Sequence, residues 1–132
     1  MDYLTILLAA VASMVLGFLW YGPVFGKPWM KAMGKSEADM AQAKSKGMAK
    51  MMLINFVATL VMAWVLNLVE DRTGAMSLMS ALKWAGVLWL GFMAPVELND
   101  VLFGGRSVKV FVINAGYLLV SMLAMAAVLV LV

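Results

Sequence analysis

The stretch LWYGPVFGKPW, residues 19–29, decides the fold, because a long apolar run ends there in an aromatic pair, a Gly-Pro, a Phe-Gly and the first lysine of the chain. The rings of Trp20 and Tyr21 suit the headgroup level of a bilayer. Pro23 lacks the N–H group that a continuing helix needs. The stretch therefore predicts a membrane-spanning helix that ends at Trp20 and Tyr21.

Similar apolar blocks account for most of the chain. They run from Tyr3 to Tyr21, Met48 to Val69, Leu78 to Leu98 and Val108 to Val132. Each has close to the roughly 20 residues that an α-helix needs to cross a bilayer. Only 13% of the residues are charged, against about 25% in soluble domains. We predict an all-α integral membrane protein with four transmembrane helices, a single domain over residues 1–132 that leaves little chain for a soluble catalytic head.

The chemical inventory is poor, since the chain contains no cysteine and no histidine. A disulfide framework and a thiolate nucleophile are excluded, and zinc and haem lose their commonest ligands. Methionine pairs at i, i+3 spacing, such as Met30 with Met33, could offer thioethers to Cu(I). Because these pairs fall at different depths and Met is a common core filler, we expect no metal and no cofactor.

Positive charge predicts the orientation. Six lysines lie in the first connection or at the start of the second block, and Arg106 and Lys109 flank the start of the fourth block. The opposite side has only Arg72 and Lys83. Because basic loops are retained in the cytoplasm, both termini are expected on the non-cytoplasmic side. The first block lacks the pattern of a cleaved signal peptide, so we expect it to be retained. The charges flank span ends, which favours lipid headgroups as partners and not nucleic acid.

The first connection has two parts. After Pro28, basic residues recur every fourth position opposite apolar ones, which predicts a short interfacial helix. The expected interfacial anchors are Trp20, Tyr21, Lys27, Trp29, Lys31 and Lys35. Ser36 to Asp39 then resembles a capping box. Two readings stay open for residues 34–47: an early start of the second transmembrane helix, or a mobile loop.

The third block carries several special residues. Pro95 is expected to bend the helix unless the helix stops there. Lys83 is expected to snorkel outward toward Glu70 and Asp71. Beyond the block, Ser107 is a candidate cap for the fourth helix.

Two pairs of short matches suggest an internal repeat. Val24-Phe25-Gly26 matches Leu102-Phe103-Gly104 at an offset of 78, and Ile54-Asn55 matches Ile113-Asn114 at an offset of 59. In both Phe-Gly corners, glycine would let the backbone turn sharply toward the next span. The matches predict two helix-corner-helix units, residues 1–70 and 76–132, in the same orientation.

The few polar residues of the apolar blocks fall near one depth. Helical rise, about 1.5 Å per residue, places Asn55 and Asn114 at one level, with Tyr117 one turn deeper and Glu97 nearer the inner end. Such groups need partners in hydrocarbon, so these four residues are candidates for one inward-facing polar cavity or proton site. Glu97 keeps two readings: a functional carboxylate, or a structural bracket with Arg106, Lys109 or Asn114.

The segment LGFLWYGPVFGKPWMKAMG, residues 16–34, closely resembles the hallmark of a family of small bacterial membrane proteins known as domain of unknown function 1761. Segments LNDVLFGGRS and FVINAGY, residues 98–107 and 111–117, are also similar to that family. The resemblance implies a four-span α-helical protein of the bacterial inner (cytoplasmic) membrane. It implies no activity, cofactor or catalytic residue.

Three classes of function follow. The first is a non-enzymatic protein that self-associates or supports another membrane subunit, with helix packing at the small residues Gly17, Gly86, Gly91 and Gly116. The second is a small transporter or channel with an inner-side polar cavity around Glu97. An enzyme acting on a membrane-soluble substrate is disfavoured, because its potential bases Glu97 and Lys83 lie toward opposite faces of the membrane.

Overall fold

In the computed structural model, which describes residues 3–34, 38, 47–74 and 77–132, the described chain is helical throughout apart from short turns. The elements are α1 (Tyr3–Leu19), η1 (Trp20–Val24), α2 (Gly26–Met33), α4 (Met48–Thr73), α5 (Leu78–Leu88), η2 (Trp89–Met93), α6 (Ala94–Leu102) and α7 (Val108–Leu131). Four continuous segments are long and apolar enough to span a membrane: Tyr3–Val24, Ala49–Thr73, Leu78–Leu102 and Val108–Leu131. The predicted all-α, four-span class is confirmed.

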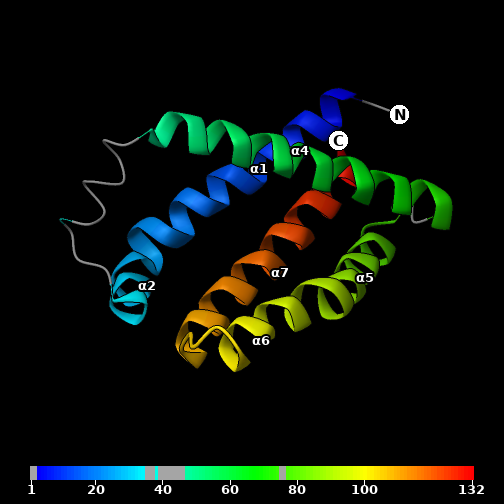
Figure 1. The fold of residues 1–132 in the computed structure, drawn as a ribbon. Coiled ribbons are helices and arrows are strands. Elements are labelled where there is room, and N and C mark those ends of the chain that lie inside the picture. Colours follow the sequence, from blue (N-terminus) through cyan, green and yellow to red (C-terminus); the bar gives the residue numbers. More distant parts are fainter. Residues whose placement is uncertain (1–2, 35–37, 39–46, 75–76) are drawn as a thin grey trace.

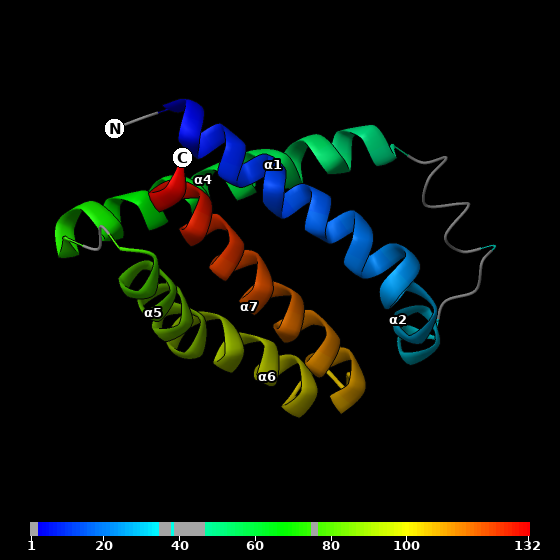
Figure 2. The ribbon, with the colours of Figure 1, turned by 180° about the vertical axis from the view of Figure 1, so that it is seen from behind.

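Helix α7 lies at the centre of the arrangement (Figure 1). It packs against α1 on one side and against α5 and α6 on the other, while α4 crosses α1 at a steep angle. The view from behind shows that the two termini lie close together at one end of the molecule (Figure 2). The α6–α7 turn and α2 lie at the opposite end.

The core lies near the termini, where α1, α4, α5 and α7 all meet. It is built largely from alanines with no exposed surface, Ala9, Ala63, Ala81, Ala85 and Ala126, filled in by Ile6, Leu66, Met122 and Met125. Small side chains let helices approach closely, which is how helices associate in lipid. Large apolar side chains instead cover the outside, including Phe92 at 74% exposure and Leu53 at 63%. This distribution suits a chain whose solvent is hydrocarbon.

Both prolines within the spans are accommodated by π-helical turns. Pro23 lies inside η1, where the N–H of Phe25 bonds the carbonyl of Trp20 at 2.7 Å, and Pro95 lies in the first turn of α6, directly after η2. The wider turn leaves room for the pyrrolidine ring at a position where proline cannot donate a backbone hydrogen bond. The prediction that the first helix ends at Trp20 and Tyr21 is therefore wrong, because the helical segment runs on to Val24.

The two Phe-Gly corners share a backbone geometry. Phe25 has φ −120° and ψ 7°, and Phe103 has φ −116° and ψ −22°. A Cβ on Gly26 would lie 2.6 Å from the carbonyl oxygen of Tyr21, and one on Gly104 would lie 2.7 Å from that of Asp100. Glycine is required at both corners by this close approach of backbone to backbone. The repeat of units 1–70 and 76–132 itself stays a prediction.

The ends of α2 and α4 bear on the first connection. Gly34 ends α2 and Gly47 precedes α4, both in left-handed conformation with φ 73° and 92°. Helix α4 therefore begins directly after Gly47, and the two readings for residues 34–47 fall mostly outside the described residues. Lys35 and most of the capping box proposed at residues 36–39 lie outside the described residues. The predicted cap of α7 is confirmed, because the Ser107 hydroxyl oxygen accepts a bond from the Val110 N–H at 3.2 Å.

Helix α2 has the two faces that the sequence predicts. Lys27 and Lys31 are exposed, while Trp29, Met30 and Met33 are half-buried against the bundle. Its position at the membrane surface stays a prediction.

Candidate functional site: the polar seam between α1 and α7

Several polar side chains of the first and last spans meet where η1 and α1 pack against α7. We call this contact the α1–α7 seam, formed by Ser13, Trp20, Tyr21, Asn114, Tyr117 and Ser121.

The middle of the seam is a cluster of three hydroxyls. Ser13 and Ser121, 2% and 1% exposed, join their Oγ atoms at 2.5 Å. The Tyr117 hydroxyl donates to the carbonyl oxygen of Ser13 at 3.1 Å and also lies 3.4 Å from its Oγ. Because lipid offers no hydrogen-bond partner, the two serine hydroxyls depend on each other, whereas the Tyr117 hydroxyl joins the helices through a backbone carbonyl.

Aromatic residues form the end of the seam nearest η1. The Tyr21 hydroxyl donates to Oδ1 of Asn114 at 2.7 Å, and the Trp20 indole N–H donates to the Ile113 carbonyl at 3.0 Å. The rings of Tyr21 and Tyr117 meet edge to face, with centroids 5.3 Å apart. Trp20 and Tyr21, predicted as interfacial anchors, therefore direct their polar atoms onto α7.

Two of the four predicted packing glycines belong to this seam. A Cβ on Gly17 would lie 3.1 Å from the Tyr117 hydroxyl oxygen, and one on Gly116 would lie 3.2 Å from the Trp20 ring. Gly17 and Gly116 thus allow α1 and α7 to approach within the monomer. Gly86 and Gly91 differ, since a Cβ at either would meet nothing within 4 Å. These two glycines face away from the rest of the fold.

A second tryptophan repeats the role of Trp20. Trp89 donates its indole N–H to the carbonyl of Ala115 at 2.8 Å, two residues along α7 from the carbonyl that Trp20 binds. Each tryptophan is the first residue of a π-helical turn. Trp89 is not among the predicted site residues, but the sequence signal for this pair is the match of LWYG at residues 19–22 with LWLG at residues 88–91.

Glu97 lies near the seam without joining it. It is half-buried on α6, within electrostatic range of Tyr21 and Arg106. Within the described part of the chain it has no hydrogen bond and no ion pair within 4.0 Å. The bracket with Arg106, Lys109 or Asn114 is therefore not formed among the described residues, and Oδ1 of Asn114 accepts the Tyr21 hydroxyl.

Asn55 is separate from the other three candidates. It is exposed on α4, and its amide N–H donates only to the thioether sulfur of Met14, at 3.3 Å. The structure thus brings Asn114 and Tyr117 together through Tyr21, places Glu97 nearby, and assigns Asn55 to the contact of α4 with α1.

One buried acid was missed. Glu70 is 6% exposed, and its Oε1 has no hydrogen-bond partner. Glu70 lies on the same buried face of α4 as Thr59, Ala63 and Leu66. These residues are three or four positions apart, which is the spacing of one helix face and can be recognised in the sequence. Lys83, expected to reach toward Glu70, is exposed and forms no ion pair within the described chain.

Fold and seam together define the class: an integral membrane protein of four spans whose first and last helices are joined by an internal hydrogen-bonded seam. The chain belongs to the family described as Protein of unknown function (DUF1761), whose profile matches residues 4–130. No curated protein and no solved structure matches the chain significantly. The family assigned from residues 16–34 is confirmed over nearly the whole chain.

Proposed function

We propose that the protein is a non-enzymatic, self-associating component of the bacterial inner membrane. The single observation that carries the proposal is Asn55, an exposed amide on a spanning helix. A thioether is a weak acceptor, so the one hydrogen bond of the amide leaves most of its capacity unused. An unsatisfied amide in hydrocarbon is costly, and a second copy supplies the missing partner.

The rest of the spans supports the same proposal. The hydroxyls and amide of the α1–α7 seam bond one another, so they join helices within one copy and need no water-filled passage. Gly86 and Gly91 leave open space on the α5–η2 face, where the backbone of another helix can approach closely. In a two-fold dimer the same surface of each copy meets itself, which would set Asn55 against its own counterpart.

The test is the mass of the protein in lipid nanodiscs. Asn55→Leu should shift a dimer or higher oligomer toward monomer, and Gly86→Leu with Gly91→Leu should do the same if the α5–η2 face takes part. Gly22→Leu is the matched control, because Gly22 is equally open but lies on η1. A wild-type monomer would remove the proposal, and a foreign subunit at the Asn55 face would replace self-association by an accessory role.

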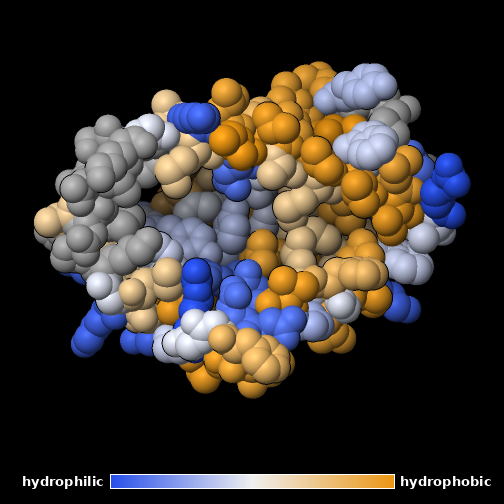
Figure 3. Space-filling view, viewed as in Figure 1, coloured by the Kyte–Doolittle hydropathy of each residue, from blue (hydrophilic) through white to orange (hydrophobic). Residues whose placement is uncertain are grey.

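A second candidate function is a small transporter, favoured because Glu97 has no hydrogen-bond or ion-pair partner among the described residues. The face in Figure 3 is hollowed between α4 and α7, and hydrophilic residues gather at its lower edge over α6 and the start of α7. Glu97 lies on α6, and a carboxylate within a span is suited to carry a proton. The test is a pH-dependent flux in proteoliposomes, which Glu97→Gln should abolish. Flux that survives this change would exclude Glu97 as the carrier.

A further inference from the structure

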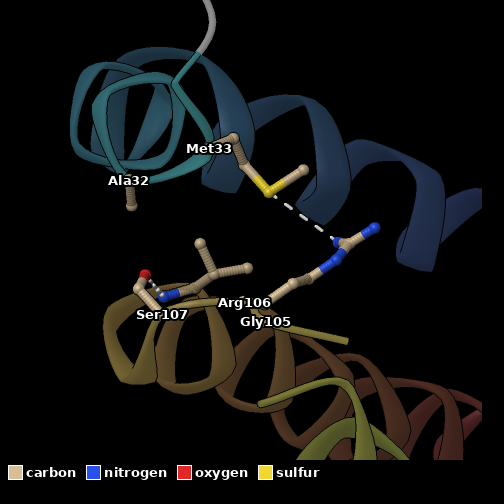
Figure 4. A pocket seen from close by; sticks show the side chains of 6 residues that line it. Ala32, Met33, Gly105, Arg106 and Ser107 are labelled. Carbon is tan, nitrogen blue, oxygen red and sulfur yellow. Dashed lines mark hydrogen bonds between the residues drawn. The ribbon is translucent and has the colours of Figure 1, made fainter. Parts of the chain in front are cut away.

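A cavity of about 370 Å³ lies between α2 and the start of α7, apart from the α1–α7 seam. It is lined by Ala32, Met33, Gly105, Arg106, Ser107 and Val110. Figure 4 shows Arg106 reaching across the gap from the α7 side toward Met33, with Ala32 facing Ser107. We propose that this cavity binds a phosphate group, carried by a phospholipid headgroup or by a soluble phosphate compound.

Arg106 is the residue that selects for phosphate. Its guanidinium donates to the Met33 sulfur over 3.7 Å, a weak contact that leaves the other N–H groups available. It forms no ion pair within the described chain, although Glu97 lies within electrostatic range. A planar guanidinium matches the oxygens of phosphate in a two-point contact, which an ammonium group cannot reproduce.

Ser107, on the same wall as Arg106, adds a second donor. The Ser107 oxygen already accepts the Val110 N–H, so its own hydroxyl proton is free to point at a ligand. The cavity is also on the basic side of the molecule, because Lys31 on α2 and Lys109 on α7 are exposed there. Asp100 on α6 fixes the turn, because its backbone carbonyl accepts the Arg106 N–H at 3.1 Å.

The residues that flank the cavity in the sequence are of the type expected at the membrane surface. The turn that holds Arg106 joins two spans, and the apolar side chains beside it are exposed: Leu102 at 64%, Phe103 at 87% and Val108 at 64%. Apolar residues of this kind insert into the boundary between headgroups and hydrocarbon, which is the level of lipid phosphates. The inference does not depend on self-association.

The experiment measures binding to the full chain in an uncharged maltoside detergent. One arm counts phosphatidylglycerol adducts by native mass spectrometry, with phosphatidylcholine as the neutral comparison, and the other titrates inorganic phosphate calorimetrically. Arg106→Gln should weaken binding about tenfold, the loss of a charged hydrogen-bonded contact, and Arg106→Lys should restore part of it. Ala32→Leu should weaken binding as strongly by filling the cavity without changing any charge.

Lys109→Gln is the matched control, because it removes one positive charge from the same turn of α7 but does not line the cavity. It should change binding less than twofold, and unchanged thermal unfolding of each variant verifies that the fold is intact. Phosphatidylglycerol binding alone assigns the lipid headgroup, and binding in both arms with the same order of variants assigns the phosphate group itself. Equal losses for Arg106→Gln and Lys109→Gln, or no binding in either arm, would overturn the proposal.

Discussion

The hydroxyl of Tyr21 donates a hydrogen bond to Oδ1 of Asn114 at 2.7 Å and so joins two spans that are 93 positions apart in the chain. Tyr21 follows the first residue of a π-helical turn, and Asn114 lies two turns into α7. The wide turn at Pro23 thus belongs to the segment that brings the phenol to the amide. Tyr21, whose residue type suits the headgroup level, here connects two helices of the bundle.

Removal of this bond should weaken the bundle. Tyr21→Phe leaves the Asn114 oxygen without its donor, at a cost of about 1 kcal/mol in the free energy of unfolding. Unfolding in detergent with increasing denaturant measures the loss. Tyr3→Phe is the control, because Tyr3 is 77% exposed and should tolerate the change. Equal stability of all three proteins would mean that the bond contributes nothing.

The buried serine pair should behave non-additively. Ser13→Ala or Ser121→Ala alone leaves one buried hydroxyl with fewer partners and should cost about 1 kcal/mol, while the double variant should cost less than the sum. The Tyr117 hydroxyl keeps its bond to the Ser13 carbonyl in every variant, so it holds the helices in register. A double-mutant cycle on thermal or denaturant unfolding gives the coupling. Strict additivity would show that the two hydroxyls do not depend on each other.

Glycines of the same sequence type should divide into two groups. Gly17→Ala places a methyl group 3.1 Å from the Tyr117 oxygen and should destabilise the monomer by about 1–2 kcal/mol. Gly86→Ala meets open space and should be neutral or stabilising, because alanine has the higher helix propensity. Unfolding of the two variants under the same conditions separates these effects. If Gly86→Ala were the more damaging variant, Gly86 would already be in contact with another copy.

The sequence predicts the architecture well because the bilayer imposes a fixed length of apolar helix. Each of the four expected blocks corresponds to one spanning helix, and the expected and observed bounds differ mainly at the ends. The error at Pro23 arose because a proline is judged locally, whereas a π-helical turn accommodates it through a carbonyl five residues earlier. Gly26 and Gly104 were recognised as corners, but the nearby carbonyls that require glycine are visible only in three dimensions.

The candidate site was harder to predict, because depth along a helix does not fix the direction of a side chain. Asn55 and Asn114 were placed at one level, yet Asn55 faces the α4–α1 contact while Asn114 faces Tyr21. Arg106 is one of three partners that the structural reading of Glu97 allows, yet its guanidinium reaches Met33. The direction of each side chain depends on how the helices pack against one another. That packing depends in turn on the small residues between the helices.

Orientation can be tested directly, because the chain contains no cysteine of its own. Thr73→Cys at the end of α4 should react with a membrane-impermeant maleimide added to intact spheroplasts. Ser107→Cys, at the start of α7, should react only after the membrane is permeabilised. This result is expected because eight of the ten Lys and Arg residues lie on the side of Ser107. The reverse pattern would place both termini in the cytoplasm.

Replacement of the buried Glu70 is expected to stabilise the protein. The Glu70 side chain is buried and its Oε1 has no hydrogen-bond partner among the residues that the structure describes, so no contact there offsets the desolvation of this oxygen. Glu70→Met keeps the length of the side chain and removes the polar atoms, so it should raise the free energy of unfolding by about 1–2 kcal/mol. Asp71→Asn is the control, because Asp71 is exposed and should have little effect. A loss of stability in Glu70→Met would show that the carboxyl group has a partner from outside the chain, and a search for a bound cation or a second copy at the end of α4 would follow.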